Sequence, residues 1–215
     1  MGVKVGPRII QNGLILDVDA AVLRSYSGTG LTAFGLIGGI GGTLVNGVGF
    51  DTTNNGYFIF DGSNDYINSG NDSNIQVSSG TISAWARTSS PGGGFRGIIA
   101  KQFAYGIFYS DSVFVAYDWQ AAAVRSSGIN IADGAWKNVV LTFSGGSGNL
   151  YLNGSALSNF TYNINNNSYN LFIGAEANAN QYAACNIAQS LVYNRALTAS
   201  EILQNYNATK RRYGL

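Results

Sequence analysis

The sequence contains no histidine, a single cysteine and few charged residues, which make up only 11% of the chain. The absence of histidine excludes Ser-His-Asp and Cys-His catalysis, histidine-ligated zinc and acid–base chemistry by an imidazole. Cys185 has no second cysteine to pair with, so the fold does not depend on an oxidising compartment. We expect Cys185 to be a small buried side chain and not a nucleophile.

Clusters of basic residues and long apolar runs are also scarce. The net charge is +1, and the only basic run is Lys210–Arg212. Nucleic-acid binding depends on clustered Lys and Arg, so we predict no nucleic-acid partner. We interpret the run as a solvated tail or as favourable charges after a helix, with a phosphate or lipid contact as the alternative. No apolar run reaches the roughly 18 residues of a membrane span or resembles a signal peptide, so we predict no membrane partner.

Apolar side chains (46%) and glycine (29 residues) are abundant instead. Short apolar runs separated by Gly, Asn and Ser predict many short strands joined by turns. A length of 215 residues suits one all-β sandwich domain spanning 1–215. The expected strands are Ile9–Asp17, Tyr57–Asp61, Tyr66–Asn68, Thr81–Thr88, Gly97–Lys101, Tyr105–Tyr109, Val113–Trp119, Ala122–Ser126, Trp136–Phe143, Asn149–Leu152, Leu171–Ile173 and Ala183–Tyr193.

Alternating side chains within these strands predict two stacked sheets, because neighbouring residues of a strand face opposite sides. One strand is expected to turn Ile82, Ala84 and Ala86 to the core, and another Val139, Leu141 and Phe143. The strand Val113–Trp119 separates two sets: Val113, Val115, Tyr117 and Trp119 from Phe114, Ala116 and Asp118. The fold class is therefore all-β, a two-sheet jelly-roll sandwich.

One short helix is expected near the end of the chain. Thr198 and Glu201 have the spacing of a capping box, in which each side chain bonds the other's backbone N–H. Leu197 and Ile202 fit the accompanying hydrophobic staple. An apolar stripe of Ile202, Leu203 and Tyr206 is expected to pack on the sandwich.

The candidate ligand-binding residues are gathered around one strand. Exposed aromatic rings bind sugars through their flat apolar faces, and Tyr117 and Trp119 are the candidate rings. Asp118 and Arg125 are predicted to share their neighbourhood and to supply polar contacts. For any one of these residues, a core or subunit contact is the alternative.

Acidic residues offer little for catalysis or for a metal. Glycoside hydrolysis requires two carboxyl groups that flank the scissile bond. The only glutamates are Glu176 and Glu201, and Glu201 is assigned to the helix cap. Asp61 and Asp65 lie in one compact loop and are the weak metal candidates, with an ordinary turn as the alternative. We expect no catalytic residues and no cofactor.

Several landmarks together resemble one family. They are Asn12–Ala21, Gly42–Gly47, Phe60–Ile67, Ile82–Trp85, Trp136–Val140, Leu150–Gly154 and Val192–Thr198. In this order the segments resemble the laminin-G-like, concanavalin A-like lectin/glucanase superfamily, and the resemblance implies its β-sandwich fold. The family usually has a histidine after the tryptophan, where this chain has Lys137. Its calcium-associated acid near the last strand is also missing, since that strand reads Ile187–Gln189. Calcium is therefore the one cofactor that the family resemblance suggests, but the residues of this chain do not support calcium binding.

The opening and the ending of the chain resemble tailed-phage virion proteins, whose particles assemble in the host cytoplasm. The leading hypothesis is thus a non-enzymatic virion surface protein that decorates a capsid or forms part of a tail or fibre. Its expected partners are other virion proteins or further copies of itself. The alternatives are a carbohydrate-binding module for host surface glycans and, third, a glycan hydrolase. Fold alone does not choose among them.

Overall fold

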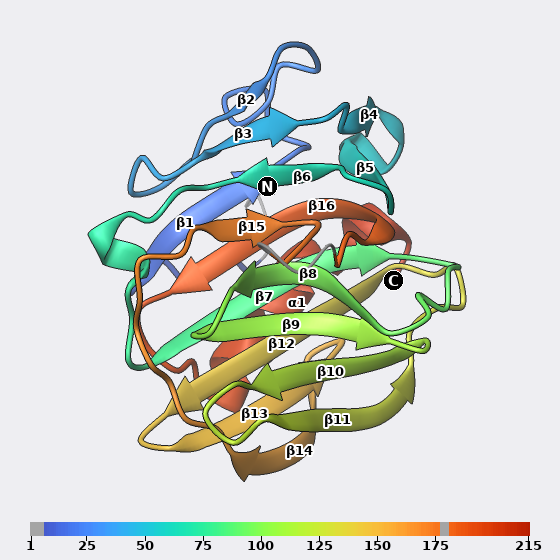
Figure 1. Cartoon of the computed structure of the whole chain (residues 1–215). Coiled ribbons are helices and arrows are strands. Elements are labelled where there is room, and N and C mark those ends of the chain that lie inside the picture. The colour runs from blue at the N-terminus through green and yellow to red at the C-terminus, as the bar shows by residue number, and fades with distance from the viewer. Residues whose placement is uncertain (1–6, 177–180) are drawn as a thin grey trace.

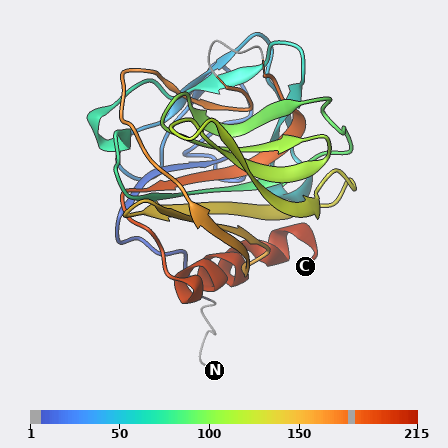
Figure 2. The ribbon, with the colours of Figure 1, turned by 60° about the horizontal axis from the view of Figure 1, so that its bottom comes forward.

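Two antiparallel sheets face each other across one core, and a helix covers the outside of one of them (Figures 1 and 2). The structure is a computed structural model that describes residues 7–176 and 181–215. The sheet in the foreground of Figure 1 is called the front sheet, and the sheet between it and the helix is called the back sheet. The predicted all-β, two-sheet sandwich with one C-terminal helix is confirmed.

The back sheet has eight strands in the order β14-β13-β12-β7-β16-β5-β4, with β1 also paired to β16. Their bounds are β1 Leu14–Asp19, β4 Gly49–Asp51, β5 Tyr57–Asp61, β7 Gly80–Arg87, β12 Lys137–Ser144, β13 Ser147–Leu152, β14 Ser155–Thr161 and β16 Ala184–Tyr193.

The front sheet also has eight strands, in the order β11-β10-β9-β8-β15-β6-β3-β2. Their bounds are β2 Thr32–Ala33, β3 Gly42–Val45, β6 Tyr66–Asn68, β8 Phe95–Lys101, β9 Tyr105–Ser110, β10 Val113–Asp118, β11 Ala123–Asn130 and β15 Leu171–Ile173. Two short 3₁₀ turns, η1 (Thr53–Asn55) and η2 (Ser73–Ile75), lie in the connections.

The core forms from one face of each sheet, as the alternation predicts. Ile82 and Val139 reach it from the back sheet, and Tyr105, Ile107 and Phe114 from the front sheet. All five are essentially inaccessible to solvent. Burying such a side chain contributes roughly 1.5–3 kcal/mol each, so this interface holds the two sheets together.

Most predicted strands are confirmed, with shifted ends, but four strands escaped the sequence analysis: β2, β3, β4 and β14. The predicted strand Ile9–Asp17 was placed too early, because the chain turns at Gly13 (φ 81°) and pairing begins at Leu14. The strand β14 lacks the expected alternation: it is a largely exposed edge strand, its register against β13 shifts between Leu150 and Tyr151, and its core contacts Leu157 and Phe160 are three residues apart.

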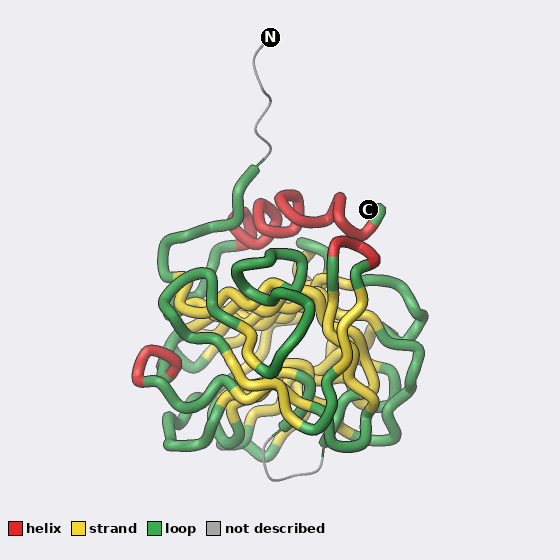
Figure 3. The backbone as a smooth tube through the Cα atoms, turned by 90° about the horizontal axis from the view of Figure 1, so that it is seen from above, coloured by secondary structure: helices red, strands yellow, loops and turns green. Residues whose placement is uncertain are grey.

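Helix α1 (Ala199–Thr209) starts at the predicted capping box. The Glu201 N–H donates to Thr198 Oγ1, and the Thr198 N–H donates to Glu201 Oε2. Ile202 is buried against the back sheet, but Leu203 is 46% exposed, so the predicted stripe is narrower than expected. Figure 3 shows the helix lying along one side of the sandwich. In the described part of the chain, no helix has the length and apolar character needed to cross a membrane.

The basic run Lys210–Arg212 lies in a 3₁₀ turn, η3 (Lys210–Tyr213), directly after the helix. Its expected role as a solvated tail is wrong for Arg212. The Arg212 guanidinium donates to both carboxylate oxygens of the buried Asp19, at 2.9 and 2.8 Å. This ion pair connects η3 to the end of strand β1 in the back sheet.

Candidate functional site

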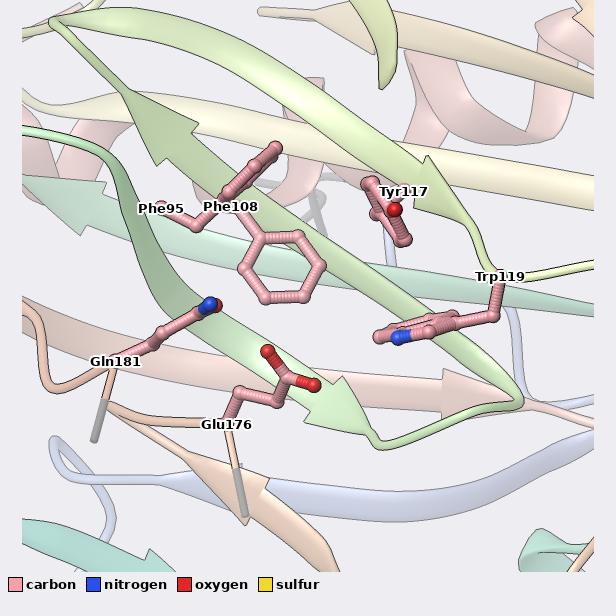
Figure 4. A pocket seen from close by; sticks show the side chains of 6 residues that line it. All are labelled: Phe95, Phe108, Tyr117, Trp119, Glu176 and Gln181. Atoms are coloured by element: carbon pink, nitrogen blue, oxygen red, sulfur yellow. The ribbon is translucent and has the colours of Figure 1, made fainter. Parts of the chain in front are cut away.

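A cavity of about 250 Å³ opens on the outer face of the front sheet, on the side away from the helix. Figure 4 shows its lining: Phe95, Phe108, Tyr117, Trp119, Glu176 and Gln181. Four of the six side chains are aromatic, one is a carboxyl group and one is an amide.

Three of the aromatic rings come from the neighbouring strands β8, β9 and β10, and Trp119 comes directly after β10. Tyr105 and Ile107 of β9 face the core, so Phe108 faces outward, and in the same way Phe114 of β10 faces inward and Tyr117 outward. Hydrogen-bonded pairing of β8, β9 and β10 brings these outward residues together.

The four rings form a closed circuit of edge-to-face contacts. The ring centroids of Phe95 and Phe108 lie 5.9 Å apart, and those of Phe108 and Trp119 lie 5.9 Å apart. The contacts of Tyr117 with Trp119 (5.5 Å) and with Phe95 (5.4 Å) close the circuit. Edge-to-face pairs are the preferred arrangement of aromatic side chains and contribute about 0.5–1.5 kcal/mol each. The rings are therefore fixed in position without a ligand.

Of the four predicted ligand-binding residues, the structure places Tyr117 and Trp119 at the cavity but turns Asp118 and Arg125 away from it. Asp118 follows the inward face of β10 and is fully buried. Its Oδ1 accepts the N–H groups of Gln120 and Ala121, and its Oδ2 accepts from Arg125 at 3.1 Å. Asp118 and Arg125 thus lie in the predicted neighbourhood but not on the face that carries Tyr117 and Trp119, because adjacent residues of a strand face opposite sides. Asp118 and Arg125 instead hold the turn that presents Trp119.

Glu176 enters the cavity from the segment after β15. The strand β15 pairs with β8, which brings this segment beside Phe95. The approach is so close that a Cβ on Gly97 would lie 2.6 Å from the Glu176 backbone nitrogen, so β8 requires glycine at that position. In Figure 4 the Glu176 carboxyl group points toward the Phe108 ring.

Glu176 is only 6% exposed. Burial raises its pKa to about 7, and a side-chain hydrogen bond with Gln102 only partly offsets that effect. Near neutral pH the group therefore exchanges between its neutral and charged forms. This is the kind of perturbed carboxyl that accompanies binding and catalytic sites.

Gln181 completes the polar side of the cavity. Its backbone carbonyl accepts the N–H of Gly97 at 3.0 Å, which fixes the residue against β8. Its buried side-chain oxygen Oε1 has no hydrogen-bond partner among the described residues. A buried acceptor without a donor is costly, so the cavity is suited to a ligand that supplies one.

Four lining residues were not identified from the sequence: Phe95, Phe108, Glu176 and Gln181. Phe108 carried a usable signal, since it is an apolar residue on the outward face of a strand whose inward face is already apolar. Glu176 and Gln181 carried none, because only the pairing of distant strands brings them to the rings.

The other acids that the sequence analysis considered lie away from this cavity. Glu201 accepts two hydrogen bonds from Arg195 at the helix start, which lower the pKa of Glu201 to about 2. Asp61 Oδ1 accepts the Ser63 N–H at 2.7 Å, and Asp65 Oδ2 accepts the Asp61 N–H at 3.3 Å. No group of three or more potential metal ligands occurs among residues 7–176 and 181–215.

Comparison with solved structures finds the same fold in two binding domains and in a sialidase. The binding domain of Paraclostridial Mosquitocidal Protein 1 aligns over 91% of this chain and 52% of its own (TM-score 0.72, 16% identity). Trypanosoma rangeli sialidase in complex with sialic acid aligns over 97% of this chain and 36% of its own (0.73, 14%). The receptor-binding domain of botulinum neurotoxin type G aligns over 91% and 51% (0.63, 19%). This chain thus spans about half or less of each of these proteins, and the likeness is one of fold.

No curated protein sequence matches the chain. The family model of the concanavalin A-like lectin/glucanases superfamily matches residues 61–203, which include most strands of both sheets and the start of the helix. The resemblance inferred from the sequence landmarks is confirmed: the chain belongs to the concanavalin A-like lectin/glucanases superfamily.

Proposed function

We propose that this chain is a non-catalytic carbohydrate-binding domain, and that a sugar ring occupies the cavity of the front sheet. The observation that carries the proposal is the circuit of four aromatic rings beside a carboxyl and an amide. Sugars present apolar C–H faces, which pack on aromatic rings, and hydroxyl groups, which donate to such acceptors. The cavity, at about 250 Å³, is slightly smaller than ordinary small-molecule pockets and suits one sugar residue.

The solved structures add support of a general kind. Two of the similar chains are receptor-binding domains of botulinum neurotoxins, and another is a sialidase in complex with sialic acid. Recognition of glycans by this chain would be consistent with its structural likeness to these binding domains.

Binding without catalysis is proposed because Glu176 is the one carboxyl group among the described residues that line the cavity. A glycosidase of the usual kind needs a second carboxyl group on the other side of the bond. Glu201 lies on the helix side of the back sheet and is held by Arg195, so it cannot take that role.

A glycan array followed by calorimetry on its best ligands tests the proposal. We expect binding that Trp119→Ala weakens at least tenfold, while Phe34→Ala, which removes a 61% exposed ring away from the cavity, leaves it unchanged. An array without a specific ligand, with and without calcium, would reject the proposal. Equal loss in both variants would place the site elsewhere.

We further propose that this domain acts on the surface of a virion, as part of a capsid, tail or fibre that assembles in the host cytoplasm. The support is the resemblance of its opening and ending to tailed-phage virion proteins, together with exposed apolar side chains such as Leu23 and Leu31. Sedimentation of the purified chain with phage capsids and with tails tests this setting. A chain that stays monomeric and pellets with neither contradicts it.

A further inference from the structure

The cavity is lined by a carboxyl group but by no cation among the described residues. Glu176 contributes a carboxyl group and Gln181 a side-chain oxygen that has no partner among the described residues. No lysine or arginine is among the described residues that line the cavity. Residues 177–180, between the two in sequence, are alanine and asparagine and bring no charge.

The basic residues of the neighbouring strands are engaged elsewhere. Arg96 donates to the backbone oxygens of Phe95 and Gly93, and Arg125 is paired with Asp118. Lys101 of β8 donates to Asn71 Oδ1 and to two loop carbonyls. Among the described residues, no ion pair includes Glu176.

A second aromatic cluster, on the outer face of the back sheet, contains a cation that the chain itself supplies. There the Arg87 guanidinium carbon lies 5.1 Å from the ring centroid of Tyr57 and 5.0 Å from that of Trp136. Aromatic faces attract cations through their negative quadrupole. The cavity of the front sheet has the rings and, in addition, a carboxyl group, but it has no such arginine.

We infer that the sugar bound in this cavity carries a positively charged amine, which sits between the aromatic rings and Glu176, and that acidic sugars are rejected. This inference rests on the proposed carbohydrate-binding function and narrows its ligand class. An ammonium group would donate to the carboxylate, beside its hydrogen bond with Gln102, and to Gln181 Oε1, which has no other partner among the described residues. It would also compensate the charge that burial disfavours on Glu176. A sugar carboxylate would meet the like charge of Glu176 with no arginine or lysine to offset it.

The test compares sugars that differ in one group. Calorimetry or ligand-observed NMR at pH 7 measures the amine, the acetamide and the uronic acid of the gluco and galacto series, with tetramethylammonium as a cation without a sugar. We expect an amine to bind at least tenfold more tightly than its acetamide counterpart, and the uronic acids not to bind. Tetramethylammonium should bind weakly and lose its binding in Trp119→Ala.

The variant Glu176→Gln isolates the charge, since it keeps the shape of the side chain. We expect the preference for the amine to fall to about onefold in Glu176→Gln, and to persist in Asp133→Asn, an acid-to-amide change outside the cavity. Circular dichroism of both variants checks that they are folded.

Two failures are distinguishable. If neutral or acidic sugars bind in a manner that depends on Trp119 but not on Glu176, the inference is overturned and the carbohydrate-binding proposal stands. If neither these sugars nor an array glycan binds, the carbohydrate-binding proposal fails and the inference fails with it.

Discussion

The outer faces of the two sheets carry comparable aromatic clusters, but only the cluster on the back sheet is covered by the helix. On the back sheet, Trp85 is stacked on Tyr213 with ring centroids 4.1 Å apart, beneath the helix and its 3₁₀ extension. On the front sheet, no helix or strand among the described residues lies over the circuit around Phe108 and Trp119, which borders a cavity. The difference teaches that an aromatic outer face is not a site in itself. It becomes a candidate site only where the chain leaves it uncovered.

The largest effect that the comparison predicts is on stability. Trp85 is 1% exposed, and its indole N–H donates to Thr209 Oγ1 at 2.8 Å. Trp85→Ala should therefore lower the free energy of unfolding by about 3–5 kcal/mol. Trp119→Ala, at the partly exposed cavity, should cost only about 1 kcal/mol. Urea denaturation followed by circular dichroism measures both. Equal losses would show that the front cluster is as structural as the covered one.

The second prediction concerns the dependence of stability on pH. Burial raises the folded-state pKa of Glu176 from 4.5 to about 7, so the folded protein holds this proton more tightly than the unfolded chain does. The stabilisation from this group is complete below about pH 4.5 and is lost as pH rises through 7. Glu176→Gln should thus stabilise the protein by up to about 3 kcal/mol at pH 8 and have little effect at pH 4.

Thermal unfolding of the wild type and of Glu176→Gln across this range checks the sign. A variant that is destabilised at pH 8 would indicate that the charged carboxyl is compensated within the protein, which would also weaken the case for a cationic ligand.

The third prediction tests which interaction holds η3, at the end of the covering helix, on the back sheet. Arg212→Met removes both hydrogen bonds to Asp19, which is 1% exposed, and leaves that carboxylate unpaired. We expect a loss of about 2 kcal/mol in the free energy of unfolding. Arg211→Met, at the exposed neighbouring position, is the matched control and should change little. If the two variants unfold alike, the ion pair does not anchor the end of the chain.

The smallest expected effect comes from the start of the covering helix. Thr198→Ala removes the acceptor of the Glu201 N–H and should cost about 1 kcal/mol. Ser200→Ala, within the first helical turn, is the control and should be neutral or slightly stabilising. Chemical denaturation resolves this difference when the two variants are measured side by side. A neutral Thr198→Ala would mean that packing of Leu197 and Ile202 alone sets the helix start.

Much of the fold was predictable from local rules. The alternation in β7 and β12 correctly assigned Ile82 and Val139 to the core, because a strand between a core and an outer face keeps its two sides distinct. The capping box fixed the start of α1, because its two hydrogen bonds involve residues three positions apart. The same rules failed for β14, because its two core contacts, Leu157 and Phe160, are three residues apart and so break the two-residue period.

The candidate site was only half predictable. Tyr117 and Trp119 could be found because their strand alternates, and the same alternation would have removed Asp118 from the list. Glu176 reached the cavity through the pairing of β15 with β8, a contact between segments far apart in sequence. No local pattern encodes such a pairing.

By itself, the sequence determined the sandwich, the capped helix and the absence of histidine chemistry, since each depends on residue type or on spacing within one element. Only the tertiary structure decided which aromatic face lies under the helix and which remains open. It also decided that one carboxyl group should lie among the open rings without a cation. The physical reason is that covering a face and desolvating a charge are properties of packed neighbours, and those neighbours come from every part of the chain.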